Sequence, residues 1–130
     1  MKMRIEVPQL PPVEYSGNSR AHWAKQYQAG RVYQAAVFYC CVDARNRALM
    51  EGTNYLFIKP RLNLTFIFPS ARRRDEDNLR ARFKPGLDAI VDAGLLLDDD
   101  VEHVQLGKVD ILVDPGRAPL TIIELELEEN

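Results

Sequence analysis

The residues best suited to chemistry lie in the segment RRRDEDNLRARFK, residues 72–84, where three arginines precede Asp75 and Asp77. In an extended segment, side chains two residues apart point to the same side, so both carboxylates could address one site. Carboxylates held that close repel each other, and at least one tends to stay protonated unless a cation lies between them. Mg²⁺ binds a few carboxylates together with water and phosphate oxygens and would remove this conflict. The pair therefore indicates a candidate metal site, with a solvated acidic loop as the simpler alternative.

Further acidic groups and a lysine follow within 25 residues. The run Asp98–Asp100 offers a third carboxylate ligand, and the alternative is a solvated turn. At 100° per residue, a helix over about 78–93 places Lys84 on the same side as Asp77 and its apolar residues on the other side. Lys84 could therefore act at the site or be an ordinary solvated lysine, and Pro85 is expected to kink or restart the helix. The apolar side consists of Leu79, Phe83, Leu87 and Ile90.

The charges are divided unevenly along the chain. Residues 1–84 hold 15 Lys and Arg against 7 Asp and Glu, whereas residues 85–130 hold 2 against 12. A protein with a formal net charge of −2 can therefore still present a basic face to nucleic acid. Arg72, Arg73 and Arg74 would then contact phosphates, which would make binding depend strongly on salt. The alternatives are plain surface arginines and two halves that neutralise each other across the fold.

Composition sets the class of protein. The chain has 130 residues, of which 46% are hydrophobic and 28% charged, as expected for one globular domain spanning 1–130. Without an apolar run of about 18 residues or an apolar signal core, we expect no membrane span and a cytoplasmic protein. Cys40 and Cys41 are too few for a zinc site, and we expect them to be reduced and core-facing. His22 and His103 are isolated, so we expect ordinary polar roles for both.

Periodicity predicts an α+β fold with a mixed or antiparallel sheet packed with two main helices. Alternation in the last segment places Ile123, Leu125 and Leu127 on one side, opposite Glu124, Glu126 and Glu128. Apolar spacing in the first helix selects Trp23, Tyr27, Tyr33, Val37, Cys40, Ala44 and Ala48, with Ser19 as its N-cap. The predicted elements are strands at 3–7, 62–68, 104–113 (with a bulge at Gly107) and from about 120, and helices at about 22–49 and 78–93.

The central segment RRRDEDNLRARFKPGLDAIVDAGLLLDDDVEHV resembles the signature of the RusA family of Holliday junction resolvases. That signature has a basic run, Asp-x-Asp-Asn, a lysine four residues before an aspartate, Ala-Gly and then paired aspartates. The corresponding residues here are Arg72–Arg74, Asp75–Asn78, Lys84 with Asp88, Ala93-Gly94 and Asp98-Asp99. The segment from Asn78 to Asp88 is about one helical turn longer than in the best-known members, which leaves Arg80 or Arg82 as alternatives to Lys84.

The resemblance implies a RusA-like fold and a homodimeric endonuclease that resolves four-way DNA junctions by paired symmetrical nicks. Its metal would be Mg²⁺, with Mn²⁺ as an alternative, and a bacterial or phage-encoded origin would be expected. A catalytically inactive module that binds branched DNA is the alternative function. The resemblance implies that Asp75, Asp77 and Asp99 are the metal ligands, with Asp98 or Asp100 as alternatives for the third ligand. It implies Lys84 as the catalytic cation. The implied DNA-binding residues are Arg72, Arg73, Arg74, Arg80, Arg82, Asn18 and Arg20.

Overall fold

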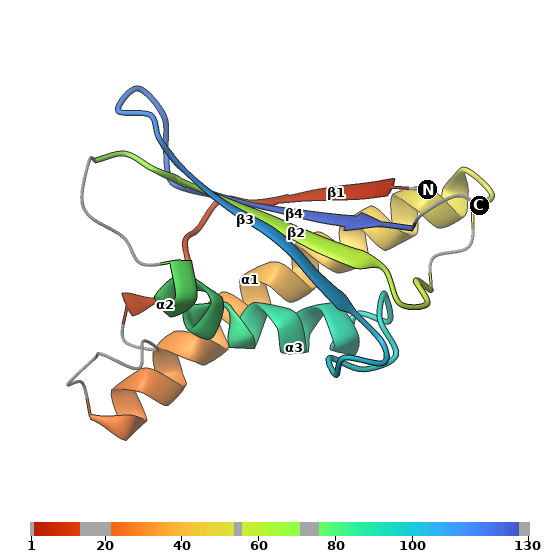
Figure 1. The fold of residues 1–130 in the computed structure, drawn as a ribbon, viewed down its shortest axis with the longest axis horizontal. Coiled ribbons are helices and arrows are strands. Elements are labelled where there is room, and N and C mark those ends of the chain that lie inside the picture. Colours follow the sequence, from red (N-terminus) through yellow and green to blue (C-terminus); the bar gives the residue numbers. More distant parts are fainter. Residues whose placement is uncertain (1, 14–21, 54–55, 71–75, 128–130) are drawn as a thin grey trace.

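The computed structural model is a small α+β domain with one four-stranded mixed sheet (Figure 1). It describes residues 2–13, 22–53, 56–70 and 76–127, except for the side chains of Glu76 and Asp77. The elements in chain order are β1 (Lys2–Val7), α1 (Trp23–Met50), β2 (Arg61–Phe68), α2 (Glu76–Arg82), α3 (Lys84–Asp92), β3 (Gln105–Val113) and β4 (Leu120–Glu126). The predicted fold class is confirmed.

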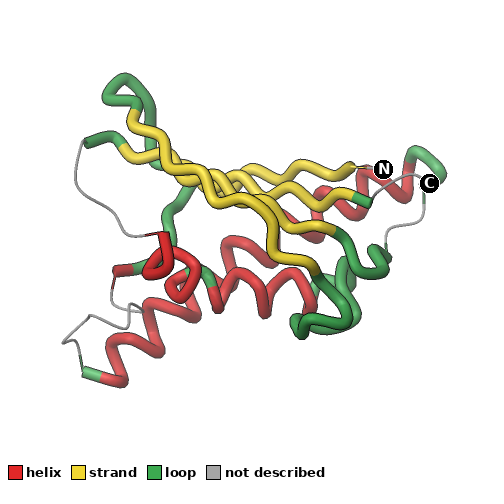
Figure 2. The backbone as a smooth tube through the Cα atoms, in the orientation of Figure 1, coloured by secondary structure: helices red, strands yellow, loops and turns green. Residues whose placement is uncertain are grey.

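The strands are ordered β1-β4-β2-β3 in the sheet, so β3 lies at one edge. Strand β4 runs antiparallel to both β1 and β2, whereas β2 and β3 are parallel. Parallel neighbours need a crossover connection, and α2 and α3 are part of it. The helices lie on one side of the sheet, as both backbone views show (Figures 1 and 2). The crossover thus brings α2 next to the start of β3, where Arg80 contacts Gly107.

The core forms between that side of the sheet and the helices. Strand β1 alternates between exposed and buried residues, and in β4 the side chains of Ile123 and Leu125 are fully buried. Helix α1 buries Tyr33, Val37 and Cys41 against this layer. The predicted alternation is confirmed from Ile123 to Glu126, where the helices cover one face of the sheet. Leu120–Ile123 are all buried, because Leu120 and Ile122 pack with Ile67 in a second, smaller cluster.

Helix α1 departs from the prediction at its start. Trp23 and Tyr27 were expected on the core face, but their exposed fractions are 72% and 62%. The first turns of α1 project past α2 and α3 (Figure 1), so these side chains continue the apolar face beyond the described residues of the core. The N-cap is His22, whose Nδ1 accepts a hydrogen bond from the backbone N–H of Ala24 at 3.2 Å. The predicted cap, Ser19, lies outside the described residues.

The second predicted helix is two helices that meet at Phe83. Pro85 lies in the first turn of α3, where its missing N–H costs no helical hydrogen bond. Phe83 is buried with its ring edge-on to Tyr33 and Phe66, which holds the junction against the core. The predicted restart is confirmed. Because Asp77 and Lys84 belong to different helices, the rule of 100° per residue does not place them on the same helix face.

The bulge predicted at Gly107 is confirmed. Leu62 pairs with Leu106 but Leu64 pairs with Val109, which leaves two residues of β3 opposite Asn63. The Asn63 side-chain oxygen accepts a hydrogen bond from the backbone N–H of Lys108 at 2.9 Å. A Cβ atom at Gly107 would lie 2.1 Å from that oxygen, so a side chain at this position would displace the Asn63 amide from the bulge.

Neither Cys40 nor Cys41 is in a disulfide in the structure. Cys41 is buried, which raises the pKa of its thiol to about 12, and Cys40 is half-buried. Nothing in the described part of the chain is both long and apolar enough to be a membrane-spanning helix.

Candidate active site

The candidate site lies between the first turn of α3 and the loop that follows the same helix. Helix α3 ends at Asp92 and is followed by Gly94, whose φ of 81° suits glycine. The N–H of Leu95 donates to the carbonyl of Ile90 at 3.2 Å. This hydrogen bond closes the helix end and turns the chain back along it. Leu95 and Leu96 are buried, and the N–H of Phe57 donates to the Leu95 carbonyl at 3.0 Å. The loop that carries Asp98–Asp100 is thereby anchored at its start.

Lys84 is held between two carboxylates. Its Nζ lies 3.0 Å from Oδ1 of Asp88, one turn further along α3, and it also donates a hydrogen bond to Oδ2 of Asp99. The contact with Asp99 raises the pKa of Lys84, and the ammonium group lowers the pKa of Asp99. Lys84 and Asp99 are therefore both charged at neutral pH, and the fold has brought together two members of the predicted catalytic set.

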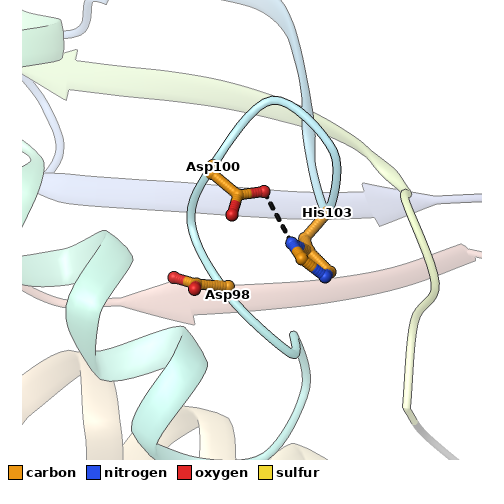
Figure 3. A group of neighbouring side chains, drawn as sticks. All are labelled: Asp98, Asp100 and His103. Carbon is orange, nitrogen blue, oxygen red and sulfur yellow. Dashed lines mark hydrogen bonds and ion pairs between the residues drawn. The ribbon is translucent and has the colours of Figure 1, made fainter.

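The neighbouring aspartates have other partners. Asp98 accepts a hydrogen bond from the backbone N–H of Asp99 at 2.7 Å, and Asp100 accepts one from the N–H of Glu102 at 3.0 Å. Asp100 also contacts Nδ1 of His103 at 2.6 Å, which raises the pKa of this imidazole (Figure 3). Of the three aspartates left open by the sequence, Asp99 is thus the one whose carboxylate contacts Lys84.

Asp98, Asp100 and His103 form a group that sequence reasoning missed. One potential ligand atom from each residue lies within 4.8 Å of the others, and the two aspartates are exposed (Figure 3). The sequence feature that could have indicated this group is the three-residue spacing of Asp100 and His103, which suits a turn. In the structure the N–H of His103 donates to the Asp100 carbonyl at 3.0 Å. His103 is not isolated, because the turn places its ring against a carboxylate.

The two arginines of α2 lie against the body of the domain. Arg82 has an exposed fraction of 7%, and its Nη2 donates to the carbonyl oxygen of Pro11 at 2.6 Å. This contact turns the Arg82 guanidinium into the domain, and the DNA-binding and catalytic roles considered for Arg82 stay predictions. Arg80 is half-buried and donates from Nη2 to the Gly107 carbonyl at 3.0 Å, which joins α2 to the bulge of β3. The role of Arg80 in DNA binding stays a prediction.

A largely apolar pocket of about 490 Å³ adjoins Lys84. It lies between the β2–β3 edge of the sheet and helices α2 and α3. Its apolar wall lowers the local polarity on one side of the Lys84 stem, while the ammonium group reaches the acidic loop. The lining residues are Leu62, Leu64, Arg80, Ala81, Phe83, Lys84, Leu87 and Leu106.

Several predicted site residues lie outside the described part of the chain. These are Asn18, Arg20, Arg72, Arg73, Arg74 and Asp75. Asp77 is placed in the first turn of α2, but its side chain is not described. Since α2 already begins at Glu76, the argument from an extended Asp-x-Asp segment does not apply at Asp77. The predicted convergence of Asp75 and Asp77 on Asp99 stays a prediction.

Fold and side chains together define a small α+β protein with a lysine–carboxylate site at the crossover between two parallel strands. No protein-family model matches the chain. A protein of Xylella fastidiosa (strain Temecula1) described as "Uncharacterized protein" is 36% identical over 115 residues, which cover 79% of this chain and 71% of the relative. The chain belongs to the same family as this Xylella fastidiosa protein.

Proposed function

We propose that this protein is a Mg²⁺-dependent endonuclease of the RusA type that cuts four-way DNA junctions by paired nicks. The observation that carries the proposal is the contact between Lys84 and Asp99, which are 15 residues apart in the sequence. Both belong to the acidic and basic set that the sequence resemblance assigns to catalysis. Their contact is what a common site requires.

The donor chemistry fits a hard divalent cation. Asp99 presents an ionised carboxylate, because its contact with Lys84 lowers its pKa. Oxygen ligands of this kind are those that Mg²⁺ prefers, and Mn²⁺ accepts them too. In the proposal, Asp99 holds the metal together with Asp75 and Asp77. When bound, the metal would supply an activated water and stabilise negative charge on the phosphate.

Lys84 is the proposed catalytic cation. Its side chain is 48% exposed, so the ammonium group can reach a phosphate while the stem stays on α3. A fixed positive charge at this position would stabilise charge that develops on the phosphate or on the leaving oxygen. The burial of Arg82 supports Lys84 over one of the two alternatives for this role. Arg72–Arg74, Arg80, Asn18 and Arg20 are proposed to contact the DNA backbone.

A homodimer is part of the proposal, because one active site makes one nick. Two-fold symmetry would present two equivalent sites to the two strands of a junction. The expected location is the cytoplasm of a bacterium, with the gene carried by the bacterium or a phage. Sedimentation equilibrium, with and without junction DNA, measures the assembly, and a monomer in both conditions would contradict this part.

The deciding experiment is a cleavage assay on a labelled synthetic four-way junction, with linear duplex of the same sequence as control. We expect paired nicks with Mg²⁺ or Mn²⁺, none with a chelator, and none on the duplex. Asp77→Asn, Asp99→Asn and Lys84→Met should each lower the rate at least about a hundredfold, the order of loss for one preorganised electrostatic group. Junction binding, measured by gel shift, should persist in these variants.

The matched control is Asp110→Asn. Asp110 is an exposed carboxylate on β3, between Val109 and Ile111, which pack on the core from the other face. This variant should cut like the parent protein. Junction binding without cleavage by any divalent metal would instead identify an inactive branched-DNA-binding module. Full cleavage by Asp99→Asn or Lys84→Met would reject the proposed site.

A further inference from the structure

Three side chains form a row along the first turns of α1. Trp23, Tyr27 and Arg31 are spaced four residues apart, which places them next to each other on one side of a helix. The guanidinium carbon of Arg31 lies 6.0 Å from the centre of the Tyr27 ring. We call these three residues the aromatic row.

The exposure of this row follows from where the core ends. Trp23, Gly30 and Val37 are seven residues apart and therefore share one helix face. Gly30 and Val37 are buried, but Trp23 lies on the turns that project past α2 and α3 (Figure 1) and is 72% exposed. Large aromatic side chains that continue a core face into solvent indicate a binding surface.

The charge around the row favours a polyanion. Residues 23–42, most of α1, include Lys25 and Arg31 but no Asp or Glu. Among the described residues, Asp92 of α3 is an acidic side chain that reaches this half of α1: it accepts a hydrogen bond from Gln34 at 3.2 Å and lines the same surface pocket as Arg31. The row itself thus combines two ring faces with a positive charge.

We propose that the aromatic row binds unpaired DNA bases. Trp23 and Tyr27 provide flat surfaces on which bases stack, and Arg31 contacts the adjoining phosphate. In a branched DNA, such bases are available where strands separate, so the inference extends the proposed junction activity and rests on it for the identity of the substrate. A second copy of the chain is a poorer occupant, because each copy would bring Lys25 and Arg31 to the contact, and residues 23–42 hold no Asp or Glu to pair with them.

The sequence supplies its own probe, since Trp23 is the only tryptophan. Titration of the full chain with oligo-dT should quench the tryptophan fluorescence, and the matching linear duplex should quench it far less. Binding of fluorescently labelled oligo-dT, followed by anisotropy, measures the affinity of variants that lack the tryptophan. We expect Trp23→Ala and Tyr27→Ala each to raise the Kd by about five- to a hundredfold, the range for losing one base–aromatic stack.

Two further variants separate stacking from charge and from general surface effects. Arg31→Ala should reduce the slope of log K against log salt by about 0.7, as expected for losing one phosphate contact on a single strand. Tyr39→Ala is the matched control, because Tyr39 is also an exposed aromatic residue of α1, at 71%, and is three turns beyond Tyr27. Its Kd should equal that of the parent protein.

Unchanged oligo-dT affinity in both Trp23→Ala and Tyr27→Ala would overturn the proposal. So would a tryptophan signal that changes with protein concentration without DNA and leaves oligo-dT binding unaffected, because the row would then be an interface between copies. Junction cleavage without any effect of the row refutes this inference and leaves the nuclease intact. Oligo-dT binding through the row without junction cleavage would support this inference and refute the proposed nuclease activity.

Discussion

The ion pair between Lys84 and Asp99 should be measurable as a coupling between two substitutions. Lys84→Met and Asp99→Asn remove one charge each at similar side-chain size, and the double variant removes both. Because the Lys84 side chain is 48% exposed and that of Asp99 26%, water screens the pair. We therefore expect a coupling free energy of about 0.5–1 kcal/mol, the upper part of the range for pairs at a protein surface. In a domain of this size that corresponds to roughly 2–4 °C in Tm.

The pH dependence of this coupling has a definite sign. The pKa of Asp99 is lowered in the folded protein, so its contribution is present above the ordinary value of 3.8 and is lost as the pH falls through the folded pKa. The pKa of Lys84 is raised, so its contribution is present below 10.5 and is lost as the pH rises through the folded pKa. The coupling should therefore be constant across neutral pH and decrease at both extremes.

Urea unfolding of the four proteins at low salt measures the coupling, and carboxyl NMR measures the Asp99 pKa directly. High salt should shrink the coupling, because the screening length falls to about 3 Å at 1 M. Asp110→Asn is again the control, since its effect should add to that of Lys84→Met without coupling. A coupling indistinguishable from zero at low salt and neutral pH would refute the reasoning, and the proposed function would lose the contact on which it depends.

Three other outcomes are expected. Gly107→Ala should lower the free energy of unfolding by about 1–3 kcal/mol in urea titrations, because the new methyl group would lie 2.1 Å from the amide oxygen that caps the bulge; a neutral effect would show that the Asn63 side chain moves aside without cost. Tyr33→Phe should cost about 1–2 kcal/mol by thermal unfolding, because the buried Tyr33 hydroxyl donates to Oγ1 of Thr121 at 2.9 Å; unchanged stability would show that this bond is dispensable. Asp100→Asn should lower the pKa of His103 in an NMR titration, because the Asp100 carboxylate raises it; an unchanged pKa would place the imidazole away from Asp100.

Some outcomes of folding could be predicted from neighbouring residues alone. Ile123 and Leu125 alternate with glutamates, and a strand covered on one side has to bury such a face. The bulge at Gly107 and the restart at Pro85 were visible in the same way, because a glycine within a strand and a proline within a helix break the local hydrogen-bond pattern. These features need only information from within one element.

Other outcomes depended on contacts between elements. Arg82 has the same local surroundings as Arg80, but only Arg82 is buried, because Pro11 lies against it. Trp23 and Tyr27 follow the core periodicity of α1 and are exposed because the helix is longer than the layer it packs on. Lengths and partners of this kind are not encoded in the spacing along a single helix.

The sequence by itself determined the α+β class, the alternation of the last strand and the supply of acidic and basic groups between residues 72 and 100, because these follow from residue type and local period. Only the tertiary structure decided that Asp99, rather than Asp98 or Asp100, contacts Lys84. The closure of α3 at Gly94 turns the chain back toward the start of its own helix, and that reversal selects which carboxylate meets the ammonium group.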